Sequence, residues 1–191
     1  MAAGKNYICK IYEKRGFICI DLDKLTHNII EKARNKILES FKTIAEKLGI
    51  NLLKEDGTIN RKALGKLVFS DARLLKQHES IIYSYIIEDV KKIIEENSNM
   101  PIIINATVLY KTPELLQMCS KILYVNAPSF IRLIRAKKRD KMPIFQILRR
   151  FWVQKNLLKE YKKFNIPLTI FNNYKGCFIG KETKEQLSLF D

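Results

Sequence analysis

Several features that define common classes of small protein are scarce in this 191-residue sequence. It has two histidines and four cysteines, Cys9, Cys19, Cys119 and Cys177, and no two cysteines have CxxC spacing. This pattern excludes a disulfide framework and the usual zinc sites, and thiols in a reducing compartment are the simpler interpretation. No apolar run approaches membrane-spanning length, and residues 1–20 lack the layout of a signal peptide. We therefore expect a cytoplasmic protein without membrane association.

Negative charge is scarce relative to positive charge. Lys and Arg number 35 and Asp and Glu 20, which gives a formal net charge of +15. A field of that sign attracts polyanions such as nucleotides, phosphorylated metabolites, nucleic acid or anionic lipid. Because Lys and Ile are both abundant, a biased coding composition explains the excess equally well. Charge therefore leaves the partner open, whereas a hydrophobic content of 47% excludes a disordered chain.

Short apolar runs alternate with amphipathic segments along the chain. The runs are β-branched and predict buried strands at 17–23, 101–109, 121–126 and 167–173. Apolar residues at three- and four-residue steps predict a short helix ending at Gly16, a long helix through 30–48, and helices over 72–96, 129–140 and 143–163. Alternating strands and helices indicate a parallel α/β sheet, in which ligands bind at the C-terminal ends of the strands.

A glycine and a lysine stand directly before the first helix, in the sequence Ala3-Gly4-Lys5-Asn6. A Gly-rich turn at a helix N-terminus presents backbone N–H groups to phosphate, and a lysine there meets the β- and γ-phosphates. The full P-loop pattern is GxxxxGK followed by Ser or Thr, whereas this chain begins after the first Gly and has Asn6 in place of the hydroxyl. We expect Met1 to be an internal methionine of a longer gene product. A plain helix start is the alternative interpretation.

Two acids, Asp21 and Asp23, end the first predicted strand. Phosphoryl transfer needs a group that accepts the proton of the attacking hydroxyl, and acids near the metal. Alternate residues of a strand face the same side, so we expect both carboxylates on one face. The alternative is a solvated strand end that caps a helix.

Three arginines, Arg132, Arg135 and Arg139, are spaced by three and four residues. This spacing places them on one face of the helix predicted over 129–140. Guanidinium groups bind phosphate bidentately, and a basic helix of this kind can close over a transferring phosphoryl group. A solvated basic face is the alternative.

Taken together and in this order, these segments resemble the dephospho-CoA kinase family. The family's P-loop, first helix and strand ending in Asp-x-Asp are similar to the stretch AAGKN, which is followed after nine residues by GFICIDLDKLTH. EDGTINRKALGKLVFSD resembles its Asp-Gly-Thr-x-x-Arg-x-x-Leu segment and is the most specific stretch. VNAP with the arginines resembles the strand and lid helix, Gln154 falls where the family has a glutamine, and TIFNN resembles the last strand. The resemblance spans residues 2–173.

The resemblance implies a three-layer α/β/α parallel sheet of the P-loop nucleotide-kinase type, in a single domain over 1–191. It implies a nucleotide-binding core over 1–23, 99–128 and 165–175, and a helical CoA-binding segment over 24–98. A lid with the helix that follows it spans 129–163, and a tail spans 180–191. The implied activity is phosphorylation of the ribose 3′-hydroxyl of dephospho-CoA by ATP with Mg²⁺, the last step of coenzyme A biosynthesis.

The family's functional residues carry over by position. The resemblance implies catalytic roles for Asp23, Lys5, Arg135 and Arg139, and substrate-binding roles for Asp21 and Arg61. The implied ATP-binding residues are Ala2, Ala3, Gly4, Lys5, Asn6, Tyr7 and Asn172. Asn6 is also the candidate Mg²⁺ ligand, through its amide oxygen.

The sequence departs from the family at several positions. Tyr83-Ser84 replaces a His-Pro pair, and Thr107–Lys111 replaces Pro-Leu-Leu-x-Glu, which reverses a charge. With the net charge, these departures favour a second hypothesis, a catalytically impaired P-loop protein that associates with nucleic acid or a sliding clamp. A P-loop kinase with another nucleoside or nucleotide acceptor is a third, although the EDGTINRKAL stretch argues against it.

The last residues carry a separate signal. QLSLFD resembles the short peptide by which bacterial replication and repair proteins dock on the DNA sliding clamp. Leu187, Leu189 and Phe190 would anchor in an apolar groove, and Gln186 is placed for hydrogen bonds. The alternative is an amphipathic turn that covers the protein's own core.

Overall fold

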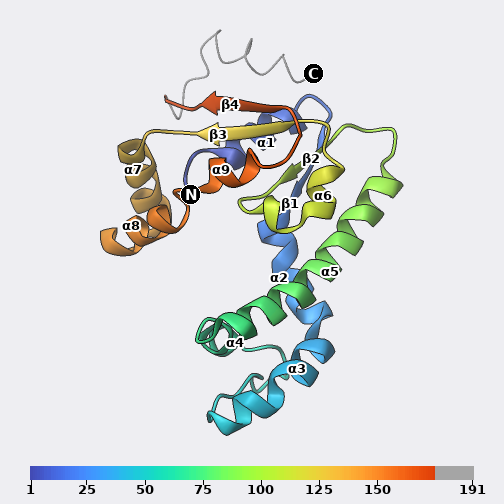
Figure 1. The fold of residues 1–191 in the computed structure, drawn as a ribbon, viewed down its shortest axis with the longest axis vertical. Coiled ribbons are helices and arrows are strands. Elements are labelled where there is room, and N and C mark those ends of the chain that lie inside the picture. The colour runs from blue at the N-terminus through green and yellow to red at the C-terminus, as the bar shows by residue number, and fades with distance from the viewer. Residues whose placement is uncertain (175–191) are drawn as a thin grey trace. The chain divides into compact units, whose positions relative to one another are not determined.

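The computed structural model describes residues 1–174 (Figure 1). They form two compact units: the first combines Met1–Arg15 with the residues from Thr107 onward, and the second is Gly16–Ala106. All four predicted strands form, and they pair in parallel, as predicted, with one pair in each unit. Within the described residues, no helix combines the length and the apolar character that crossing a membrane requires.

The second unit joins one strand pair to four helices. β1 (Ile18–Asp21) pairs with β2 (Ile102–Asn105), with Asp21 opposite Asn105. The helices are α2 (Leu22–Lys32), α3 (Arg34–Lys47), α4 (Arg61–Val68) and α5 (Ala72–Glu96). The long helix predicted through 30–48 is wrong in one respect: the chain breaks at Ala33, which ends α2 and precedes α3.

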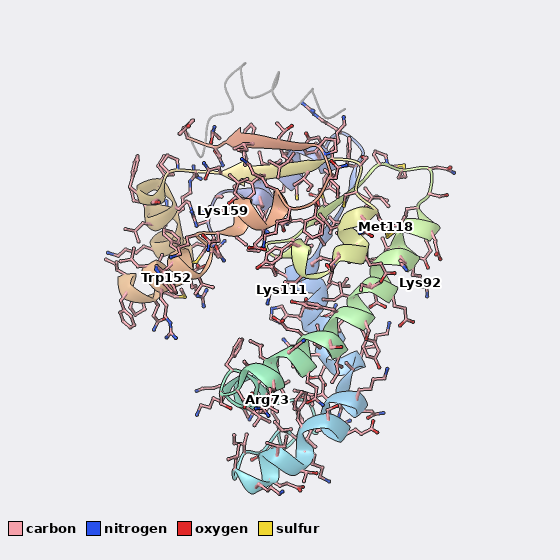
Figure 2. The ribbon with its side chains drawn as sticks, in the orientation of Figure 1. Arg73, Lys92, Lys111, Met118, Trp152 and Lys159 are labelled. Carbon is pink, nitrogen blue, oxygen red and sulfur yellow. The ribbon has the colours of Figure 1, made fainter. Side chains whose placement is uncertain are left out.

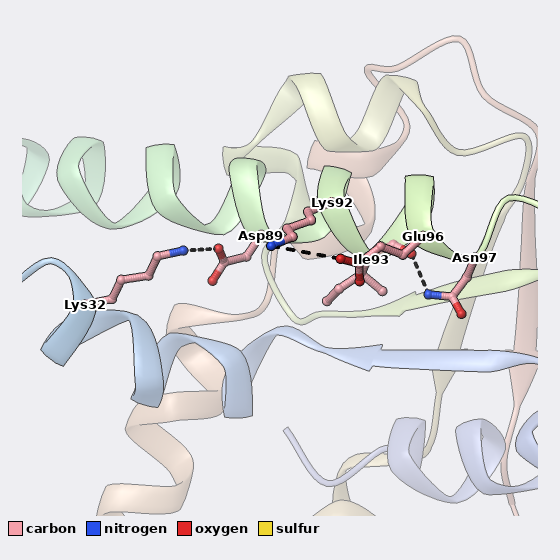
Figure 3. Close-up of polar contacts among 6 residues, drawn as sticks. All are labelled: Lys32, Asp89, Lys92, Ile93, Glu96 and Asn97. Carbon is pink, nitrogen blue, oxygen red and sulfur yellow. Dashed lines mark hydrogen bonds and ion pairs between the residues drawn. The ribbon is translucent and has the colours of Figure 1, made fainter.

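α5 is the element around which the second unit packs, and it contacts α2, α3 and α4. Its buried residues Ile82, Ile86 and Val90 recur every four positions and so line one face. Asp71 caps it by accepting a hydrogen bond of 2.6 Å from the Arg73 amide. Figure 3 shows its other end, where Asn97 Nδ2 donates to the Ile93 carbonyl, and the ion pair between Lys32 of α2 and Asp89 of α5.

The first unit is built on the second strand pair. β3 (Ile122–Asn126) and β4 (Leu168–Asn172) run side by side in Figure 1, with Asn126 opposite Asn172. The helices are α1 (Lys5–Glu13), η1 (Leu109–Lys111), α6 (Pro113–Gln117), α7 (Ser129–Asp140), α8 (Ile144–Val153) and α9 (Leu157–Tyr161). The single helix predicted over 143–163 is wrong, because the chain turns between α8 and α9.

Tyr161 ties α9 to the segment that leads into η1. Its buried hydroxyl accepts a hydrogen bond of 2.8 Å from the Leu109 amide and donates one of 3.2 Å to the Thr107 carbonyl. Burial raises the pKa of Tyr161 to about 12. The phenol therefore stays neutral and keeps both hydrogen bonds at physiological pH. They fix the backbone of the segment in which this chain departs from the pattern Pro-Leu-Leu-x-Glu.

His78 makes the second unit sensitive to acid. It lies on α5 with its ring edge toward Phe41, and its Nδ1 atom is buried without a hydrogen-bond partner in the described residues. Burial lowers the pKa of this imidazole, against a smaller opposing effect of Glu79. The native state therefore binds fewer protons than the unfolded state once the pH falls below the ordinary histidine pKa of about 6.5.

We predict that the free energy of unfolding decreases as the pH is lowered below about 6.5, and that it decreases less in His78→Leu than in the unaltered chain. Urea unfolding of both proteins between pH 5 and 7.5 measures it, and comparing the two slopes removes the contribution of the other titrating groups. Parallel curves for the two proteins would show that His78 is not the source.

Candidate active site

The predicted phosphate loop is a left-handed turn at the start of α1. Gly4 is the N-terminal cap residue, with φ 108° and ψ 19°, and Ala2 also has a positive φ of 56°. The Gly4 carbonyl accepts hydrogen bonds of 3.1 Å from the amides of Tyr7 and Ile8. Lys5 and Asn6 therefore lie in the first turn, where the helix dipole favours an anion. The Lys5 ammonium is buried.

Two of the three arginines of α7 contact this loop. Arg132 Nε donates a hydrogen bond of 2.9 Å to the Met1 carbonyl, and Arg135 Nη1 donates one of 3.3 Å to the Ala3 carbonyl. Arg132 also covers the ring of Phe151 from α8, and burial lowers the pKa of its guanidinium. The arginines of α7 thus hold the loop by donating hydrogen bonds to the loop's carbonyl oxygens.

The third arginine, Arg139, is directed elsewhere. Its Nε atom lies 2.6 Å from Asp140 Oδ1, and the side chain is exposed. The hydrogen bonds from Arg139 lower the pKa of the Asp140 carboxyl. Arg139 thus pairs with its neighbour Asp140, whereas Arg135 contacts the loop.

The asparagine that reaches the loop is Asn173, whereas sequence analysis selected Asn172. The Asn172 side chain accepts a hydrogen bond of 3.1 Å from Asn126 Nδ2. Asn173 Nδ2 donates one of 2.9 Å to the Ala3 carbonyl. The Asn-Asn doublet was the available signal, because neighbouring residues of an extended chain point to opposite sides. Sequence alone did not tell which of the two faces the loop.

In the second unit, the two acids do not share a strand face as predicted. β1 ends at Asp21, which caps α2: its Oδ1 accepts hydrogen bonds of 3.1 Å from the Asp23 amide and 3.3 Å from the Lys24 amide. Asp23 lies in the first turn of α2 and is exposed. The predicted strand extended two residues too far at its C-terminal end, because Asp21 accepts the amides that begin the helix.

Arg61 meets α2 one turn beyond Asp23. Arg61 Nη1 lies 2.6 Å from His27 Nδ1, and Nη2 donates a hydrogen bond of 2.6 Å to the His27 carbonyl. Because a guanidinium can only donate, His27 Nδ1 is the acceptor and the ring proton sits on Nε2. Asp23 and His27 are four residues apart, so they lie on the same face of α2. His27 was missed by the sequence analysis, although it ends the quoted stretch GFICIDLDKLTH.

The EDGTINR segment forms a tight turn that packs on α2. Gly57 has φ 76°, and Asp56 accepts hydrogen bonds of 2.9 Å from the Thr58 amide and 2.6 Å from its hydroxyl, which lower the Asp56 pKa. Glu31 of α2 accepts the Ile59 amide at 3.1 Å. The Asp-Gly pair of this segment thus forms the turn, which places Arg61 at the start of α4.

The departures from the family pattern include exposed residues, Ser84, Val108 and Lys111, and half-buried ones, Tyr83 and Thr107. Lys111 ends η1 and is exposed, as Figure 2 illustrates. Ser84 lies on α5 and donates a hydrogen bond of 2.8 Å to the Ile81 carbonyl. Over residues 1–174, no cluster of three or more His, Cys, Asp or Glu side chains is placed to hold a metal ion. The residues of the predicted clamp-binding tail, Gln186, Leu187, Leu189 and Phe190, lie outside the described residues.

Comparison with known proteins places this geometry in a family. The model of the family described as dephospho-CoA kinase matches residues 1–175. The dephospho-CoA kinase of Treponema denticola is 41% identical over 176 residues, which cover 90% of this chain and 78% of that protein. That of Treponema pallidum is 38% identical over 157 residues, with coverage of 80% and 74%.

Solved structures show the same fold. A crystal structure of a Thermus thermophilus protein aligns with a TM-score of 0.77 at 19% identity, over 100% of this chain and 90% of that one. The dephospho-CoA kinase of Campylobacter jejuni aligns with a TM-score of 0.65 at 23% identity, over 100% and 91%. The chain thus has the α/β fold of a P-loop kinase, as the sequence predicted. It belongs to the dephospho-CoA kinase family. Nothing in these comparisons supports the nucleic-acid or sliding-clamp hypothesis.

We predict that Arg61 and His27 are energetically coupled. Substituting each by Ala, singly and together, should give unfolding free energies that are non-additive by roughly 0.5–1 kcal/mol, because either change alone already breaks the side-chain contact. Denaturant unfolding measures the cycle, and Lys62→Ala, which changes the exposed neighbour, is the matched control. Additive effects of Arg61→Ala and His27→Ala would contradict the contact.

Proposed function

We propose that this chain transfers the γ-phosphoryl group of ATP to the ribose 3′-hydroxyl of dephospho-CoA, with Mg²⁺ bound to the nucleotide. The observation that carries the proposal is the glycine-capped turn at the start of α1, in a chain of the dephospho-CoA kinase family. Such a turn offers backbone amides and a positive helix dipole to phosphate. The names of the relatives support dephospho-CoA as the acceptor.

The donor half of the reaction rests on residues at the start of α1. The amides of the turn and the first helical residues would bind the β- and γ-phosphates, and the Lys5 ammonium would neutralise charge that develops on the transferring group. Asn6 fits a hard cation, because its exposed side chain carries an amide oxygen in the first turn. Mg²⁺, when bound, neutralises further charge on the phosphates.

The acceptor half rests on Asp23. The 3′-hydroxyl oxygen attacks the γ-phosphorus, its proton passes to a carboxylate, and ADP leaves. Asp23 suits this role better than Asp21, because the Asp21 carboxylate already caps α2 with two hydrogen bonds. His27, with its ring proton on Nε2, and Arg61 are the neighbouring groups that would bind the acceptor. The proposed lid arginine Arg139 stays exposed beside Asp140.

Asp23→Asn should reduce CoA formation by about 10²- to 10⁴-fold, because an amide cannot accept the hydroxyl proton. Lys5→Ala should reduce it by about 10²- to 10³-fold through lost charge stabilisation. The chain is incubated with ATP, Mg²⁺ and dephospho-CoA, and CoA is quantified by chromatography.

Matched controls are Glu39→Gln on α3 for the lost carboxylate and Lys14→Ala, at the exposed end of α1, for the lost lysine. Both should leave turnover close to that of the unaltered chain. Undiminished turnover in Asp23→Asn would remove Asp23 from the mechanism, and absence of CoA formation by the unaltered chain would overturn the proposed activity.

A further inference from the structure

The residue that follows β4 is held in place by its own backbone. The Asn173 amide donates a hydrogen bond of 2.8 Å to the Asn126 carbonyl at the end of β3. Its carbonyl accepts one of 3.2 Å from Arg135 Nη2 on α7. With both backbone groups bound, the Cα–Cβ direction of Asn173 is fixed by the strand pair and by α7, so its side chain projects from a rigid support.

That side chain holds one peptide of the predicted phosphate loop. Asn173 Nδ2 donates to the Ala3 carbonyl at 2.9 Å, and Arg135 Nη1 donates to the same oxygen at 3.3 Å. In a trans peptide, the carbonyl and the following N–H point in opposite directions. The two donors that draw the Ala3 oxygen toward the strand end therefore turn the Gly4 N–H away from it. They also keep a carbonyl oxygen from facing bound phosphate.

The same amide occupies the space that a side chain at position 4 would need. A Cβ atom built on Gly4 would lie 2.2 Å from Asn173 Nδ2 and 3.5 Å from its Cγ. Gly4 also has φ 108°, a conformation that residues with a Cβ rarely adopt. Glycine is thus required here on two grounds, and one of them is the close approach of Asn173.

We propose that Asn173 is a positioning residue for ATP binding: it fixes the Ala3–Gly4 peptide in the orientation that presents the loop amides to the nucleotide's phosphates. This inference rests on the proposed function of the loop. It assigns to Asn173 a role that the sequence analysis did not give it and that differs from the direct contact with ATP expected of Asn172. Asn173 acts through the loop backbone, so its removal should weaken ATP binding and leave binding of the acceptor unchanged.

Asn173→Ala should raise KM for ATP about three- to tenfold, the equivalent of one net hydrogen bond. KM for dephospho-CoA should stay within twofold. A purely structural role would instead lower the melting temperature and shift both KM values together. The matched control is Asn165→Ala, the same change at an exposed position before β4, which should leave both KM values unchanged. An unaltered KM for ATP in Asn173→Ala would overturn the proposal.

The contact with Gly4 gives an independent test. Gly4→Ala should weaken ATP binding through backbone strain and through the clash with Asn173. Removing Asn173 relieves the clash, so the double variant should have a KM for ATP no higher than that of Gly4→Ala alone. If the two effects multiply instead, Asn173 and the loop are not coupled and the positioning role is wrong.

Titration calorimetry with Mg·ATP alone separates this inference from the proposed function. If the unaltered chain forms no CoA but binds Mg·ATP, and Asn173→Ala weakens that binding, the acceptor assignment is wrong and the positioning role stands. If the chain forms CoA and Asn173→Ala binds Mg·ATP equally well, the activity stands and the positioning role is wrong. If the unaltered chain neither forms CoA nor binds Mg·ATP, both fail.

Discussion

The register of β3 against β4 is the constraint on which the loop at the start of α1 depends. Asn126 lies opposite Asn172, and the Asn126 carbonyl accepts the next amide, that of Asn173. A slip of one residue in a parallel pair moves every side chain to the other face. It would put the side chain of Asn172 where that of Asn173 now meets the Ala3 carbonyl. The geometry of the loop is therefore set by a strand pair more than 100 residues away in the sequence.

A different constraint, helix capping, sets the place of Asp23 in the second unit. Asp21 lies in the last position of β1, and its carboxylate satisfies two of the amides that α2 leaves without intrahelical partners. The two acids of the Asp-x-Asp motif thus have different structural roles. The first ends the strand and caps the helix, and the second lies in the first turn, where it is exposed.

The sequence predicted those elements whose ends are marked by strong local signals. The bounds of α5 and α7 were predicted correctly, because Asp71 caps the first and Pro128 precedes the second. The break at Ala33 carried no such signal, since alanine is the best helix former and this one is fully buried. The order of elements and the parallel pairing followed from the alternation of apolar runs and helical periods.

Those parts of the site that depend on residue types and their spacing could be proposed from the sequence. Gly4, Lys5 and Arg135 were selected from local patterns, a Gly-Lys turn and a basic helix, and the structure brings Arg135 to the loop that leads into Gly4. Their roles at phosphate stay predictions. The pairing of Arg61 with His27 and the choice between Asn172 and Asn173 depend on contacts between distant segments. Contacts between distant segments produce no periodic pattern in a single sequence, so the three-dimensional structure was needed to identify them.

Arg135 contacts the loop, and it is also one of the two arginines to which the family resemblance assigns a catalytic role. The two roles do not compete. A guanidinium carries five N–H donors in one plane, and the carbonyls of Ala3 and Asn173 take one from Nη1 and one from Nη2. The remaining donors suffice for an anion, so a contact with phosphate would not require Arg135 to release the loop. Under the proposed function, one side chain would keep the loop amides in place and also neutralise the charge of the phosphate that they bind.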